Sequence, residues 1–145
     1  NGWRYLEVLS IDLNNSEWGC YGTDVTGTSD AIGTGEANTN TIVNQCTTPG
    51  TAAKICYNYS VTNNAVIYDD WFLPSIDELN LVYNFTVNNP TIDLDLDNGV
   101  MGTAYWSSTQ FNSNEAWYIT FASGSYNSFG KDGFGGRKIR PIRKF

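Results

Sequence analysis

The sequence predicts an α+β domain in which an antiparallel sheet packs against two to three helices. The clearest helix signal begins at Ser75, near the middle of the chain, whereas the segments after Ala104 predict consecutive strands. Helices followed by a run of paired strands are typical of α+β proteins. With 145 residues, of which 41% are hydrophobic, the chain suits one domain with a single core. We interpret residues 1–145 as a single domain and expect it to be the C-terminal part of a longer protein.

The first third of the chain predicts a strand, a loop and two helices. Residues Trp3–Leu9 alternate between two largely apolar faces, which predicts a strand buried on both sides. Residues 20–36 are rich in Gly, Thr and Asp and predict a loop. Residues Ala37–Cys46 predict a helix that ends before Pro49-Gly50, and residues Thr51–Tyr59 fit a second short helix.

The central helix has a defined start. Residues Asp70–Pro74 predict a buried strand or turn, and Ser75 then opens the helix as its N-cap. Glu78 stands three residues later, which is the spacing of a capping box. The helix ends before Asn88, and an apolar stripe is expected to face the core: Ile76, Leu79, Val82 and Tyr83.

The last third predicts a meander with a polar loop inside it. Strands are expected at 104–108, 116–121 and 137–143. Residues 125–136 mix large aromatic side chains with Gly, Ser, Asn and Asp, without alternation or helical period, and predict a loop. Antibody paratopes use a similar mixture, because aromatic rings give contact area at low entropic cost and small polar side chains adapt their hydrogen bonds.

These patterns separate a structural frame from a ligand-binding surface. Trp106 and Trp117 occupy apolar strand positions and are expected in the core. The full predicted frame is Trp71, Trp106, Trp117, Phe121 and Arg140. The predicted ligand-binding residues should be more exposed and lie on one face: Phe111, Asn114, Tyr118, Thr120, Ser123, Tyr126, Asn127, Ser128, Phe129, Asp132 and Phe134.

Charge excludes one class of partner. The net charge is −7, which argues against nucleic acid because phosphate binding needs a basic footprint. Six of the eight basic residues lie between Lys131 and Lys144. We expect them to pair with carboxylates of the same chain and with solvent, and a polyanion site is the alternative. No apolar run approaches membrane-spanning length, so direct membrane insertion is not expected.

The chain has three cysteines and no histidine. Cys46 and Cys56 are predicted to form a disulfide in an extracellular protein, because a Pro-Gly break lets the intervening chain fold back. Cys20 is then either free or paired outside this chain.

Catalytic, cofactor and metal sites find little support. A Ser or Cys nucleophile would lack its usual histidine base, and Ser107 and Ser108 follow a strand pattern instead of a nucleophile elbow. Asp93, Asp95 and Asp97 invite a calcium interpretation, but an EF-hand loop needs a glycine directly after its third acidic position and a glutamate at its twelfth. We favour an alternating edge strand there, and predict no enzyme, no cofactor and no metal.

The combination of these motifs resembles a known family, over nearly the whole chain. It is similar to the C-terminal domain of collagen-like bacterial adhesins. This resemblance implies a C-type-lectin-like fold and a role in adhesion, outside the cell or at its surface, as in a pilus, an adhesin tip or a phage fibre. Some members bind sulfated glycans. The matching motifs are Trp71-Phe72-Leu73-Pro74-Ser75, Glu78-Leu79, Tyr105-Trp106-Ser107-Ser108, Ala116-Trp117, Phe121 and Arg140-Pro141-Ile142-Arg143.

A second resemblance is to the variable proteins of diversity-generating retroelements, which use the same fold. Their last segment is rewritten by mutation of adenines, often in Asn codons. Every residue type from Ser125 to Gly136 can arise in this way except Lys131. The alternative is an ordinary surface loop. The Glu-Pro-Asn, Gln-Pro-Asp and Trp-Asn-Asp motifs of calcium-dependent lectins are absent, so calcium-dependent sugar binding is not implied.

We therefore predict a non-enzymatic adhesion module that presents a variable surface, about residues 111–136, to a protein or glycan ligand on a cell surface. One alternative is a glycan-binding domain that uses the basic C-terminal strand, without diversification. A more remote alternative is an enzyme on a lectin-like scaffold. The sequence leaves open whether the chain forms a homo-oligomer.

Overall fold

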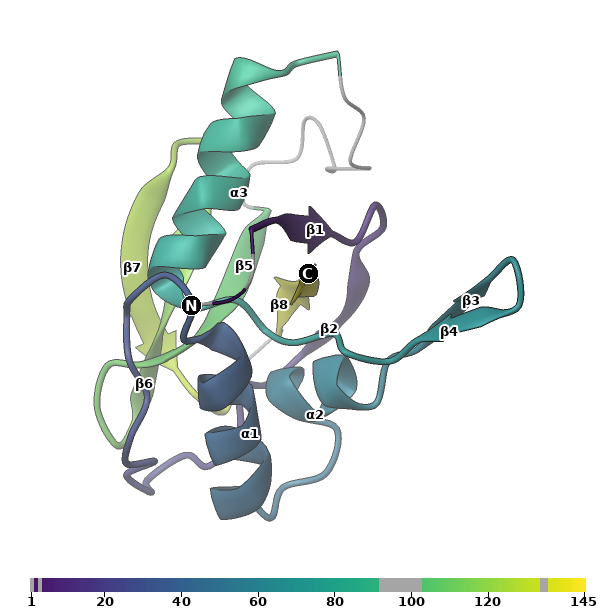
Figure 1. Ribbon diagram of the computed structural model, residues 1–145. Coiled ribbons are helices and arrows are strands. Elements are labelled where there is room, and N and C mark those ends of the chain that lie inside the picture. Colours follow the sequence, from purple (N-terminus) through teal and green to yellow (C-terminus); the bar gives the residue numbers. More distant parts are fainter. Residues whose placement is uncertain (1, 3, 92–102, 134–135) are drawn as a thin grey trace.

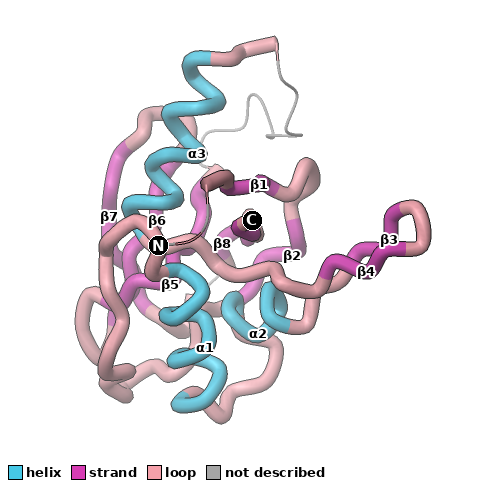
Figure 2. Tube along the Cα trace, viewed as in Figure 1, coloured by secondary structure: helices cyan, strands magenta, loops and turns pink. Residues whose placement is uncertain are grey.

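The computed structural model describes residue 2 and residues 4–91, 103–133 and 136–145, and this part of the chain has an α+β fold, as predicted (Figures 1 and 2). Its helices are α1 (Gly35–Gln45), α2 (Ala52–Tyr57) and α3 (Ile76–Asn88). Its strands are β1 (Leu6–Val8), β2 (Leu13–Ser16), β3 (Val61–Asn63), β4 (Val66–Tyr68), β5 (Ala104–Gln110), β6 (Glu115–Thr120), β7 (Ser125–Gly130), β8 (Arg137–Ile139) and β9 (Ile142–Lys144).

The main sheet has five strands in the order β2-β8-β5-β6-β7. Its pairs are antiparallel, as predicted, except that β5 and β8 run parallel at Tyr105 and Lys138. The loop between β7 and β8 carries the chain past β6 and β5, so β8 returns beside β5 and leaves β7 at the edge. This edge position of β7 is the part of the topology that bears on function.

Two smaller pairings complete the topology. β1 pairs with β9 and brings the two ends of the described chain together. β3 and β4 form a hairpin that projects from the body of the molecule (Figures 1 and 2). The expected strand or turn at Asp70–Pro74 makes a single bridge, from Phe72 to Ile142. The prediction that the first strand is buried on both sides was wrong. β1 is solvent-exposed at Glu7, because only β9 pairs with it. Trp3, which was part of the predicted strand, lies outside the described residues.

Helices cover both faces of the sheet. On one face Ile76 and Leu79 of α3 pack against Tyr105 and Ile119. On the other face α1 and α2 contribute to the largest buried cluster, together with Trp106. The members of that cluster are Trp18, Val25, Ile42, Cys46, Ala52, Ala53, Cys56, Leu73, Trp106, Ala116 and Ile139.

The capping box of α3 is present and has a second function. Ser75 accepts from the backbone N–H of Glu78, and the Glu78 carboxylate accepts from the N–H of Ser75. That buried carboxylate also accepts from Gly33 at 2.9 Å and Gly35 at 3.1 Å, so it ties the preceding loop to α3. A side chain at position 35 would collide with it, because a Cβ there would lie 2.2 Å from Glu78 Oε2.

The predicted frame is only partly buried. Trp71, Trp106 and Arg140 are buried, whereas Trp117 and Phe121 are half-buried. The expectation that Trp117 is a core residue was therefore wrong. Its ring lies 4.8 Å from that of Phe111, which is exposed in the turn after β5, so one side of the indole stays near solvent.

The loop predicted at residues 125–136 contains a strand. Six consecutive residues of β7 pair with β6, from Ser125 opposite Thr120 to Gly130 opposite Glu115. The alternation that normally reveals a strand is missing because neither face of this edge strand is buried. Main-chain pairing, and not side-chain pattern, decides the conformation here.

The disulfide prediction was also wrong. Cys20 and Cys46 form the bond, and Cys56 is a buried free thiol. Cys46 caps the end of α1, and Cys20 reaches it through a turn in which Gly19 and Cys20 both have positive φ. Cys56 points into the large buried cluster from α2, where it behaves as a small apolar side chain, and burial raises the pKa of its thiol.

We expect the Cys20→Ser variant to lose about 2–4 kcal/mol of unfolding free energy, because the bond closes a loop of moderate length. Denaturant titration of the oxidised wild-type protein and the variant measures the difference. Non-reducing peptide mapping should link the peptides of Cys20 and Cys46 and leave Cys56 alkylatable after unfolding. A Cys56→Ser variant with an intact bond is the matched control, and linkage of Cys46 to Cys56 would contradict the assignment.

Candidate ligand-binding surface

The predicted ligand-binding residues gather around the edge pair β6–β7 but lie on both of its faces. Neighbouring side chains of a strand point to opposite sides. Tyr118 and Asn127 are opposite each other in the register, and so are Trp117 and Ser128 one step away. The expectation of a single face was therefore wrong. The Arg137 face carries Tyr118, Thr120, Asn127 and Phe129, and the α3 face carries Trp117, Tyr126 and Ser128.

The Arg137 face is organised by one guanidinium group. The Cζ atom of Arg137 lies 3.9 Å from the ring centre of Tyr118 and 4.0 Å from that of Phe129. It also lies 4.7 Å from the buried ring of Trp106, so the cation connects the sheet core to the exposed edge. Its Nε atom has no hydrogen-bond acceptor among the residues that the structure describes. The outer ring, Phe129, is 40% exposed.

The α3 face combines aromatic and carboxylate groups. Phe111 packs edge-on against Trp117, and Ser128 donates a hydrogen bond of 2.8 Å to Glu115. Tyr126 is 43% exposed and borders the first turn of α3. Partial burial, and then the charge of Asp77 on α3, raise the pKa of the Tyr126 phenol. This phenol therefore stays neutral and serves as a hydrogen-bond donor at physiological pH.

The other predicted site residues lie in turns or cannot be placed. Asn114 is exposed in the turn before β6, Ser123 in the turn before β7, and Asp132 just after β7. Phe134 lies outside the described residues. The structure thus brings most of the predicted residues to one edge of the sheet, though not to one continuous face.

The basic C-terminal strand is largely occupied by ion pairs, as the sequence led us to expect. Lys138 and Arg140 both pair with Asp12, Arg143 pairs with Glu7 and Asp70, and Lys144 pairs with Glu36. Cations neutralised within the chain offer little to a polyanion. Arg137 differs from them, because aromatic rings surround its guanidinium group.

Lys131 is a structural residue that the sequence analysis did not identify. Its side chain is buried, and its ammonium group donates to Thr23 O at 2.9 Å and to Gln110 Oε1 at 2.6 Å, beneath the ring of Trp18. Its main chain bonds to Asn114 and Gly19. Lys131 thus fastens the end of β7 to the disulfide-bearing loop. The sequence contained one indication of this role: among residues 125–136, Lys131 is the one residue that mutation of adenines in an Asn codon cannot produce.

We expect Lys131 to make stability rise with pH in a defined window. Burial lowers the pKa of its ammonium group from 10.5 to about 8, although nearby Asp24 opposes the shift. The unfolded chain therefore binds more protons between these two values, and the contribution of Lys131 to unfolding free energy increases as pH rises through that window. Denaturant midpoints of wild-type protein and Lys131→Met at about pH 7 and about pH 10 test this. Between these two pH values the wild-type protein should gain unfolding free energy relative to Lys131→Met. An equal change in both proteins would contradict a lowered pKa for Lys131.

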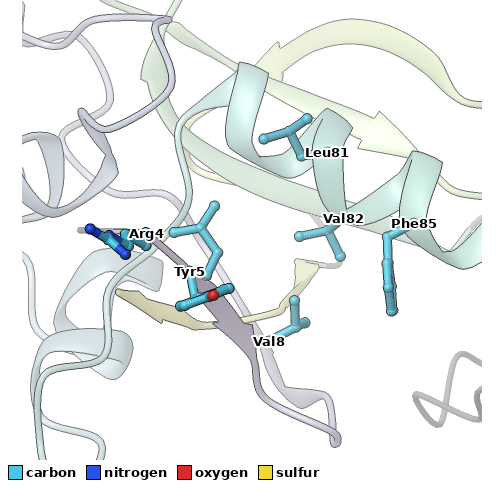
Figure 3. A pocket seen from close by; sticks show the side chains of 7 residues that line it. Arg4, Tyr5, Val8, Leu81, Val82 and Phe85 are labelled. Atoms are coloured by element: carbon cyan, nitrogen blue, oxygen red, sulfur yellow. The ribbon is translucent and has the colours of Figure 1, made fainter. Parts of the chain in front are cut away.

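An apolar groove lies elsewhere, between β1 and α3 (Figure 3). It encloses about 480 Å³ and is lined mainly by apolar side chains, with Arg4 at one end. Sites for small molecules combine apolar walls with a few convergent polar groups that fix the ligand's orientation. This groove has apolar walls but lacks such a group of convergent polar side chains, so we do not assign it a ligand. The other lining residues are Tyr5, Leu6, Val8, Leu81, Val82 and Phe85.

Within the described residues, the structure places no three His, Cys, Asp or Glu side chains close enough to hold a metal ion. Asp93, Asp95 and Asp97, which prompted the calcium alternative, lie outside the described residues. No helix in the described ranges has the length and apolar character needed to cross a membrane.

Comparison with known proteins identifies the family. A family model described as the Lcl C-terminal domain matches residues 23–143, which include helix α1, the capped helix α3 and the whole β5–β7 surface. Among curated proteins, none matches the chain. The domain is associated with adhesins, which indicates an adhesin-like module at the cell surface. Because the family match covers most of the sequence, the chain belongs to the Lcl C-terminal domain family.

Proposed function

We propose that this domain is a non-enzymatic adhesion module that binds a protein or glycan ligand on a cell surface through the β6–β7 edge. The observation that carries the proposal is the exposed edge strand β7, whose aromatic side chains Tyr126 and Phe129 lie opposite the buried residues Ile119 and Ala116 of β6. Exposed aromatic residues beside small polar ones are the expected composition of a recognition surface, and a few of them provide most of the binding energy.

The contrast between base and surface supports this proposal. Trp106 is buried beneath the Arg137 face, whereas Tyr126 and Phe129 are about two-fifths exposed. A rigid base lowers the entropic cost of binding because the exposed rings are already held in place. The sequence has no histidine to serve as the usual base for a Ser or Cys nucleophile, which favours binding over catalysis.

We also propose that residues of this edge tolerate diversification on a C-type-lectin-like scaffold. Ser125, Tyr126 and Asn127 are exposed, so their replacement disturbs no core. Lys131, the residue type that adenine mutation of Asn codons does not reach, is buried. The test is the DNA beside the gene: a reverse transcriptase next to an imperfect repeat of the 3′ end would support diversification, and its absence would leave an ordinary binding surface.

Loss of the exposed aromatic side chains should weaken ligand binding strongly without unfolding the domain. We expect a Tyr126→Ser/Phe129→Ser variant to melt close to the wild-type temperature, because changes at exposed positions have small effects on stability. Binding of the labelled domain to intact cells and to immobilised matrix proteins and glycans should fall at least about tenfold, as expected when central aromatic contacts are removed.

A matched control replaces two exposed aromatic residues of the apolar groove between β1 and α3, as in Tyr5→Ser/Phe85→Ser, and should keep binding. The single variants Tyr126→Ser and Phe129→Ser show which face of the edge pair contacts the ligand. Unfolding of the double variant would show that these rings belong to the core. Unchanged binding would refute the proposal that the β6–β7 surface contacts the ligand, and the basic C-terminal strand would then be the next candidate site.

A further inference from the structure

A second candidate site lies at the base of the β3–β4 hairpin. A hollow of about 520 Å³ opens between the end of α2 and β4, and a smaller one of about 80 Å³ lies beside it. Both are lined by Tyr57, Asp69 and Asp70. In Figure 1 the hairpin projects on the side of the molecule away from β7, so this region is distinct from the β6–β7 surface.

The walls of the larger hollow suit a long side chain with a charged end. Tyr57 is 51% exposed and lines the hollow, and Ile67 is exposed on the hairpin. Tyr59 also lines the hollow, where its ring meets that of Trp71 edge-on at 6.0 Å. Lysine and arginine lay their methylene groups along apolar surface, and tyrosine rings attract their charged ends.

The charges around the two hollows favour a cation. Asp70 pairs with Arg143, and Glu36, which lines the smaller hollow, pairs with Lys144. Asp69 is exposed and has no cationic partner among the residues that the structure describes. One carboxylate charge is thus left to attract a ligand. The net charge of −7 also favours basic ligands over acidic ones.

An independent feature points to an acceptor group beside that cation. Trp71 lines the smaller hollow and is only 4% exposed. Its indole Nε1–H finds no hydrogen-bond acceptor in the described part of the chain. A buried donor without a partner costs free energy. The Nε1 atom has almost no exposed surface in this structure, so a ligand oxygen removes that cost only after the side chains around Trp71 shift to open the wall of the smaller hollow. A peptide carries such an oxygen in its main-chain carbonyl group, next to its side chain.

We propose that Tyr57, Asp69, Asp70 and Trp71 bind a lysine or arginine residue of an extended basic segment in a partner protein. The side chain lies along Tyr57 and Ile67 with its charge at Asp69, and a carbonyl oxygen of the segment accepts from Trp71. The two-stranded hairpin supports this geometry, because its outer edges have no third strand among the described residues and can pair with an extended chain. The domain would then hold a partner at one end and present the β6–β7 edge at the other.

The test uses the acetylated, amidated hexalysine peptide as probe and the 145-residue domain labelled with ¹⁵N. The indole N–H signals of the five tryptophans report on binding separately, and the Trp71 signal should shift most. Affinity measured by calorimetry should weaken roughly two- to fivefold in Asp69→Asn and in Tyr57→Ala, and should fall as salt rises from about 0.05 M to about 0.5 M. Asp30→Asn removes an exposed charge that lines neither hollow and should keep the wild-type affinity.

Three results would overturn the proposal. Equal weakening in Asp69→Asn and Asp30→Asn would show attraction to overall charge only. Binding without a shift of the Trp71 indole would place the peptide elsewhere. Stronger binding of a neutral oligosaccharide than of hexalysine, lost in Tyr57→Ala and insensitive to salt, would make the site a sugar site. Asp69→Asn keeps the size of an exposed side chain, so it decides the question even if Tyr57→Ala unfolds.

Discussion

Replacing Trp106 by alanine should lower the free energy of unfolding by about 3–5 kcal/mol. The indole is fully buried in the largest cluster, and its Nε1–H donates to Ser16 O at 3.0 Å. Its removal leaves a cavity and deprives that carbonyl of its donor. It also takes away the innermost of the three rings around Arg137. Denaturant unfolding followed by circular dichroism measures the loss.

Trp117→Ala provides the comparison, because the same residue type is removed from a half-buried position on the other face of the sheet. We expect a clearly smaller loss of unfolding free energy, since less apolar surface returns to water. Trp106→Ala should also disturb the Arg137 face of the ligand-binding edge more than Trp117→Ala does, because Trp106 contacts Arg137 and Trp117 lies on the other face. Equal losses in the two variants would contradict the burial that the structure assigns to them.

Replacing Asp12 by alanine should also cost about 3–5 kcal/mol, because it removes the carboxylate from a buried charge cluster. Asp12 pairs with the fully buried Arg140 and with Lys138 at 3.0 Å, and it accepts a hydrogen bond from the Tyr105 hydroxyl at 3.0 Å. Burial, opposed by the Arg140 cation, raises the pKa of Tyr105 to about 12. The cluster joins the loop before β2 to β5 and to the C-terminal segment.

Glu7→Ala is the matched control, because Glu7 also pairs with an arginine, Arg143, but its side chain is 48% exposed. An exposed ion pair contributes about 0–1 kcal/mol, so this variant should unfold near the wild-type midpoint. Thermal and denaturant unfolding of both variants separates the two cases. Similar midpoints for Asp12→Ala and the wild-type protein would show that solvent reaches the cluster.

Local sequence signals predicted the elements that short-range interactions control. The capping box places the start of α3 at Ser75, because both of its hydrogen bonds lie within four residues. The apolar content of residues 104–108 and 116–121 predicted β5 and β6, and with them the burial of Trp106. The α+β class follows from the order of these elements along the chain.

Interactions between distant residues decided the features that the sequence analysis missed. Cys46 has candidate partners on both sides in sequence, and only the turn at Gly19 and Cys20 brings one sulfur within bonding reach. β7 lacks an apolar pattern because its pairing with β6 is made by main-chain atoms, which every residue carries. Sequence patterns report burial, and an edge strand with two exposed faces has little burial to report.

The sequence by itself determined which residue types stand at the candidate site, and the tertiary structure decided how they are grouped. Tyr126 and Phe129 were recognisable as surface aromatics by their polar or small neighbours, but strand alternation puts them on opposite faces of the sheet. Lys131 looked like part of the same segment, yet the folded chain buries its ammonium group against Thr23 and Gln110. Composition is local, whereas the face that a side chain occupies depends on register and on long-range packing.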